Sequence, residues 1–81
     1  MKLNVLFFGP AKILTKESEV EVELPAEATV QDAVTLILGR YPKLKEISKS
    51  LRYALDEEYT EDSMRIRDGQ TLAVIPPVQG G

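Results

Sequence analysis

The sequence predicts an α+β fold in which a mixed sheet is covered by one main helix. Segments typical of strands lie at both ends of the chain, and one stretch between them carries apolar residues at helical spacing. The chain has 81 residues, 43% hydrophobic and 28% charged, which is the composition of one ordinary globular domain. An amphipathic helix in so small a domain needs a sheet face to cover.

Two strands are predicted ahead of the helix. Residues 2–8 are β-prone and almost continuously apolar, with Leu3, Val5 and Phe7 on one face and Leu6 and Phe8 on the other. Gly9-Pro10 ends this strand, and residues 11–16 are expected to form one short helical turn. Residues 19–24 alternate strictly, so glutamates face water while three apolar residues face the core: Val20, Val22 and Leu24.

The main helix is predicted to begin at Thr29, because Thr29 with Asp32 three residues later approximates a capping box. Gly39 and Pro42 mark its end. Between them the apolar residues follow helical spacing: Val30, Ala33, Val34, Ile37 and Leu38.

The second half is predicted to complete the sheet. A weaker helical turn over residues 43–50 would bury Leu44 and Ile47, and residues 51–55 alternate as a strand, with Leu51, Tyr53 and Leu55 on one side. The acidic residues 56–62 are typical of a loop or a sheet edge. Asp68-Gly69 predicts a turn before a last strand at 71–75. This order fits a β-grasp, ubiquitin-like arrangement with the first and last strands parallel at the centre.

Composition excludes several functions. Cysteine and histidine are absent, which rules out disulfides, thiolate nucleophiles and the usual zinc sites. The net charge is −3 without a basic cluster, so nucleic acid is not an expected partner. No apolar run is long enough to cross a membrane and none resembles a leader, so a cytoplasmic location is expected. The acidic run 56–62 lacks the glycine and ligand periodicity of a calcium loop, and a solvated face is expected there rather than a metal.

The last six residues form the candidate reactive segment. We divide the chain into a domain at 1–75 and a tail at 76–81, which reads Pro76, Pro77, Val78, Gln79, Gly80, Gly81. Two prolines cannot continue a strand, and six extended residues reach roughly 20 Å. The two glycines make a thin tip that can enter a narrow channel. A cloning remnant or a frayed end is the plain alternative.

The Gly81 carboxylate is the predicted chemical centre. A terminal carboxylate, with a reference pKa of about 3.3–3.7, is ionised at neutral pH and can attack the α-phosphorus of ATP. A sulfur donor can then displace AMP and leave a thiocarboxylate. No cofactor is expected to bind stably: ATP is consumed in a transient glycyl-adenylate, and sulfur is carried covalently. Since the chain has no cysteine, its terminus is the expected place for that sulfur.

The chain resembles the small, sulfur-carrier subunits of molybdopterin synthase. The resemblance rests on Val5-Leu6-Phe7-Phe8-Gly9, on Asp68-Gly69, and above all on the segment from Leu72 to Gly81, where a strand runs into Pro-Pro-Val-Gln-Gly-Gly. It implies activation by an adenylyltransferase related to the ubiquitin-activating enzymes. It also implies a heterotetramer with a large subunit, which holds the active site and passes the sulfur to cyclic pyranopterin monophosphate to form the dithiolene.

The resemblance also implies a partner interface at Phe8, Tyr59 and Ile75. The alternative for Phe8 and Ile75 is a place in the core, whereas Tyr59 stands in the acidic run and is the better interface residue. One departure is Asp56, where many relatives carry asparagine; it puts the details of the partner surface in doubt.

Three other functions fit the same sequence. A ubiquitin-like modifier would use Gly81 for attachment to lysines, although ubiquitin-type tails are usually basic near the glycines. A sulfur carrier for thiamine or for tRNA thiolation would end in the same two glycines. A binding module that never reacts would not need Gly81.

Overall fold

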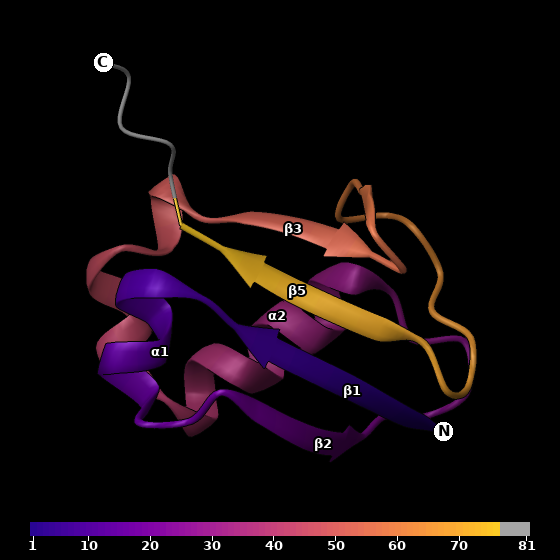
Figure 1. Ribbon diagram of the computed structural model, residues 1–81. Coiled ribbons are helices and arrows are strands. Elements are labelled where there is room, and N and C mark those ends of the chain that lie inside the picture. Colours follow the sequence, from indigo (N-terminus) through magenta and orange to yellow (C-terminus); the bar gives the residue numbers. More distant parts are fainter. Residues whose placement is uncertain (77–81) are drawn as a thin grey trace.

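The computed structural model describes residues 1–76. Its sheet has the strand order β2-β1-β5-β3-β4, in which β1 and β5 are parallel and the other neighbours antiparallel. The five strands are β1 (Lys2–Phe7), β2 (Glu19–Glu23), β3 (Arg52–Leu55), β4 (Glu58–Tyr59) and β5 (Thr71–Ile75). Figure 1 shows β1 and β5 side by side in the middle of the sheet, so the predicted β-grasp is confirmed.

One face of the sheet is covered by helix α2 (Val30–Arg40) and forms the core. The predicted capping box is present: the Asp32 amide donates to the Thr29 hydroxyl at 3.3 Å, and the Thr29 amide donates to the Asp32 carboxylate at 2.8 Å. The predicted inward residues of β1 and β2 are buried, and so are four of the five residues of the helical stripe: Val30, Ala33, Val34 and Ile37. Leu38 is only partly buried.

Helix α1 (Gly9–Thr15) begins two residues earlier than the sequence pattern predicts. Proline has a fixed φ suited to the first turn of a helix and lacks only an N–H that has no partner there, so Pro10 starts the helix as well as ending the strand. Gly9 supplies the left-handed backbone at the corner, with a φ of +53°. The buried Thr15 hydroxyl donates to the Ala11 carbonyl at 2.9 Å.

The weak helical turn predicted for residues 43–50 is two short 3₁₀ helices, η1 (Pro42–Glu46) and η2 (Ser48–Ser50). Leu44 is fully buried and Ile47 packs partly against the core, as predicted. Tyr41 precedes η1 and meets Phe7 edge to face, with ring centroids 5.5 Å apart. This contact lies at the end of β1, two residues before α1 begins.

Strand β5 leads to the predicted reactive segment. It is hydrogen-bonded on both sides, to β1 and to β3, and its Leu72 and Val74 are fully buried. It ends at Ile75, where the sequence predicts that the prolines stop the ladder. The remaining tail residues, Pro77 to Gly81, lie outside the described residues. Among residues 1–76 no helix is long and apolar enough to cross a membrane.

Candidate functional site

The sheet face opposite α2 carries apolar side chains. Pairing across the strands aligns Leu6 with Ala73, Ala73 with Ala54, and Ala54 with Tyr59. Phe8 follows the Phe7–Val74 pair, and its amide donates to the Val74 carbonyl at 3.3 Å, so Phe8 lies level with Ile75. Because side chains alternate along each strand, these residues share one face, here called the outer-face patch: Leu6, Phe8, Ala54, Ala73, Ile75 and Tyr59.

The three predicted interface residues all lie on this patch, though not in one cluster. Phe8 and Ile75 are adjacent at the end of the central strands, whereas Tyr59 is on the edge strand β4, which β5 and β3 separate from β1. Tyr59 is 69% exposed and Phe8 46% exposed. A core position is therefore excluded for Phe8, and Ile75 is partly exposed on the same side.

Three members of the patch, Leu6, Ala54 and Ala73, are not among the predicted interface residues. Leu6 could have been found, because the alternation in β1 already places it on the face of Phe8. Ala54 and Ala73 could not, since they join the patch only through the pairing of β5 with β1 and β3 and of β3 with β4. Ala54 is only 5% exposed although it does not face α2.

The patch includes a shallow depression with an acidic border. The depression holds about 430 Å³ and is lined by Leu6, Phe8, Asp56, Glu57, Thr71 and Ala73. On the other side of β1, the outward glutamates of β2 are exposed: Glu19, Glu21 and Glu23. Apolar side chains bordered by carboxylates suit a partner surface that is apolar at its centre and basic at its edge.

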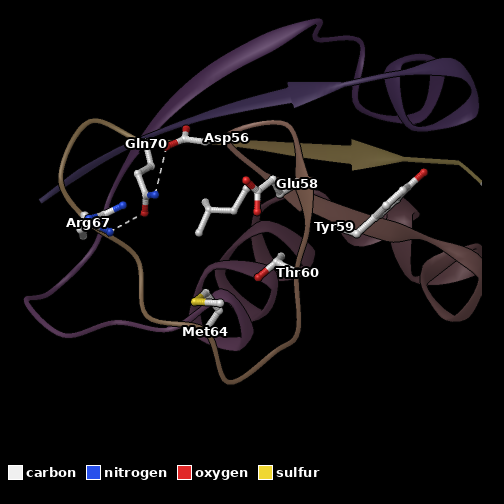
Figure 2. Close-up of a pocket in the computed structure, with 8 residues that line it drawn as sticks. Asp56, Glu58, Tyr59, Thr60, Met64, Arg67 and Gln70 are labelled. Carbon is white, nitrogen blue, oxygen red and sulfur yellow. Dashed lines mark hydrogen bonds between the residues drawn. The ribbon is translucent and has the colours of Figure 1, made fainter.

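Asp56 holds the turn between β3 and β4 against the start of β5. Its carboxylate accepts hydrogen bonds from the Thr71 amide at 2.9 Å and from Gln70 Nε2 at 3.0 Å, and Gln70 Oε1 accepts from the Arg67 amide at 2.7 Å. Figure 2 shows the contacts of Gln70 with Asp56 and with Arg67 among the residues that line a small pocket beside β4. Asp56 and Glu57 both have positive φ, 49° and 71°, as in the primed turns of tight hairpins.

These hydrogen bonds change the acidity of Asp56. The Thr71 amide, then the Gln70 side chain, favour the carboxylate and hold the pKa of Asp56 below its ordinary value. Asp56 is therefore a structural part of the hairpin and not merely the start of a solvated acidic loop. On the core side of the sheet, burial and then the charge of Asp62 raise the pKa of Tyr53.

Pro76, the first residue of the predicted tail, directly follows Ile75 of the patch and is partly exposed. It approaches Gly9 at the start of α1. The other tail residues predicted to react or to enter a partner, Pro77 to Gly81, lie outside the described part. In residues 1–76 no group of three potential ligands is arranged to hold a metal ion. What the described residues offer is an exposed apolar patch that adjoins Pro76 through Ile75.

Comparison with known proteins identifies the family of this chain. A family model described as the ThiS family matches residues 5–81. The chain belongs to the ThiS family. A molybdopterin synthase sulfur carrier subunit from Caenorhabditis briggsae is 39% identical to this ThiS-family chain over 83 residues, with 100% of the chain and 99% of the relative covered. The resemblance on which the sequence interpretation rests is thereby confirmed.

Solved structures agree with the family. The complex of subunits 1 and 2 of the molybdopterin-converting factor from Helicobacter pylori contains a chain that matches this ThiS-family chain with a TM-score of 0.75 and 27% identity, covering 100% of both. The crystal structure of SAMP1 from Haloferax volcanii matches with a TM-score of 0.90 and 22% identity, again over 100% of both chains. At that identity the second match shows the shared fold alone.

Proposed function

We propose that this chain is the sulfur-carrier subunit of a molybdopterin synthase. The observation that carries the proposal is the full-length match to a protein of that name at 39% identity. The outer-face patch beside the exit of the tail supports it, because a carrier must present its terminus and a recognition surface to the same partner.

The proposed chemistry takes place at Gly81, taken as the terminal residue of the working protein. One oxygen of its carboxylate bonds to the α-phosphorus of ATP, and pyrophosphate leaves. The resulting mixed anhydride makes the carbonyl carbon electrophilic. Sulfide-level sulfur, delivered as HS⁻ by the donor, forms the C–S bond there, and AMP leaves with the carboxylate oxygen bonded to phosphorus, which gives a thiocarboxylate. The activating enzyme supplies the ATP site and the catalytic groups, because this chain has no cysteine or histidine to supply them.

The proposed partners are the large synthase subunit and this activating enzyme. The large subunit accepts the tail and passes the sulfur to cyclic pyranopterin monophosphate, and two transfers complete the dithiolene. In the proposed heterotetramer the large subunit covers Phe8, Tyr59 and Ile75. The chain is then a sulfur donor, and the active site belongs to its partner. The proposed setting is the cytoplasm.

The experiment that tests this function is transfer to defined acceptors. The thiocarboxylated chain is mixed with a large synthase subunit and cyclic pyranopterin monophosphate, and dithiolene formation is followed by its oxidised fluorescent derivative. Parallel reactions contain a thiazole synthase or a tRNA-thiolating enzyme in place of the large subunit. Transfer only in the first mixture supports the proposal; transfer only in one of the others assigns the chain to that pathway instead.

Attachment to proteins is the second outcome that must be measured. The SAMP1 likeness concerns the fold, so it gives no weight to the modifier function. Tryptic peptide mass spectrometry of the producing cells would show a remnant of residues 68–81 on lysines if the chain were conjugated, because Arg67 is the last basic residue before Gly81. A remnant that disappears when the chain is deleted would contradict an exclusively sulfur-carrying role.

A further inference from the structure

Gly9 is the point where strand β1 turns into helix α1, and it lies against the first residue of the tail. Its φ of +53° is in the left-handed region that side-chain-bearing residues rarely adopt. A Cβ built on Gly9 would lie 3.0 Å from Cγ of Pro76, 3.7 Å from its Cβ and 4.0 Å from its Cδ. The Pro76 ring therefore packs directly over the backbone of Gly9.

Gly9 is held in place by the residues on both sides of it. The Phe8 amide donates to the Val74 carbonyl at 3.3 Å, which ties the end of β1 to β5. The Ala11 amide donates to the Phe8 carbonyl at 3.1 Å, and the Ala11 side chain is fully buried. If a methyl group were added at residue 9, the proline ring rather than the corner would have to move.

We propose that Gly9 is a positioning residue for the reactive tail, because its bare Cα lets Pro76 pack closely and so sets the direction in which the chain leaves the sheet. The inference rests on the proposed function of Gly81. At 3.0 Å the added Cβ would be closer to Pro76 Cγ than ordinary contacts allow, so Pro76 would have to shift by a few tenths of an ångström. Acyl transfer requires reacting atoms within about 3–3.5 Å, and a 1 Å misplacement can cost about a hundredfold in rate.

The test compares Gly9→Ala with Gly69→Ala in the reaction with the activating enzyme, ATP and a sulfur donor. Gly69 is the matched control: its φ is +86°, so alanine is strained there too, but nothing lies within 4 Å of an added Cβ. Gly9→Ala is expected to lower kcat by about threefold to tenfold while KM for the carrier changes less than twofold, because the outer-face patch is unaltered. Gly69→Ala is expected to keep both constants.

Pro76→Ala provides a second variant that does not depend on Gly9→Ala folding. It removes Cγ and Cδ, which include the closest atom. This variant is expected to keep the thermal stability of the wild type and to lower kcat, and Gly9→Ala is expected to add less than a further twofold loss when introduced into it. Additive losses, or equal losses in the two glycine variants, would overturn the inference, because they would show that backbone strain alone accounts for the effect.

A measurement without the enzyme separates this inference from the proposed function. In NMR spectra, Gly9→Ala is expected to abolish the nuclear Overhauser contact between the residue 9 backbone and the Pro76 ring and to shift the amide signals of residues 78–81, whereas Gly69→Ala leaves both unchanged. Unshifted tail signals with an intact contact would refute the positioning role. If these shifts occur but the wild type is never activated, the proposed function fails while the contact stands.

Discussion

Replacing Tyr59 by alanine tests whether the outer-face patch binds the large subunit. Tyr59 is 69% exposed on a two-residue edge strand, so its removal is expected to change the free energy of unfolding by less than about 0.5 kcal/mol. Tyr59→Ala is expected instead to weaken binding to the large subunit, because an exposed aromatic side chain has surface area left to bury against a partner.

The size of that effect follows from the exposed area. A tyrosine that buries roughly 200 Å² when fully covered has about 140 Å² left at this exposure, which at about 25 cal/mol per Å² sets a ceiling of about 3.5 kcal/mol. Ordering the side chain and desolvating its hydroxyl reduce this to about 2 kcal/mol, typical of a central interface residue. The expected result is a Kd raised about 30-fold.

The assay is calorimetric titration of a large synthase subunit with the wild type, Tyr59→Ala and Met64→Ala. Met64 is a matched control because it is an exposed apolar residue, 51% exposed, in the loop before β5; Figure 2 shows the Tyr59 ring pointing away from it. Met64→Ala is expected to bind like the wild type. An unchanged Kd for Tyr59→Ala, or an equal weakening by both variants, would refute the assignment of the patch.

Three further predictions concern the fold. Thr29→Ala removes the capping box of α2 and is expected to cost about 1 kcal/mol, seen as a melting temperature lower by about 4–8 °C; an unchanged value would contradict it. Because the pKa of Asp56 lies below its ordinary 3.8, its stabilising contribution is present above that pH and is lost as the pH falls through the folded-state pKa. Denaturant titrations should show that the free energy of unfolding falls less on acidification for Asp56→Asn than for the wild type. Tyr53, whose pKa is raised, should ionise later than free tyrosine in ultraviolet titration, and its contribution is lost as the pH rises above 10.0 through the folded-state pKa; Asp62→Asn should lower the midpoint.

Most of the sheet could be predicted because burial follows alternation. Glutamates and valines alternate along β2, and β1 has two distinct faces. Only one orientation of each strand buries its apolar face, and the structure shows that orientation. The capping box could also be predicted from the sequence, because its hydrogen bonds join residues only three positions apart. These features depend on neighbours along the chain.

The parts that could not be predicted depend on residues far apart in sequence. Asp56 belongs to an acidic run, and only the pairing of β3 with β5 brings it to Thr71. Gly9 was interpreted as the end of a strand, but its contact with Pro76 exists because β1 and β5 are parallel and finish at the same edge of the sheet. Tyr59 and Leu6 likewise belong to one patch only because the strands between them pair in the order β1-β5-β3-β4.

The most direct test of the account is the intact mass of the chain after incubation with its activating enzyme, ATP and a sulfur donor. The account predicts a mass increase equal to one oxygen replaced by one sulfur, located at Gly81 by fragmentation and absent when Gly81 is deleted. No such increase with an enzyme shown to be active, or an increase that survives the deletion, would contradict the claim that Gly81 carries the sulfur.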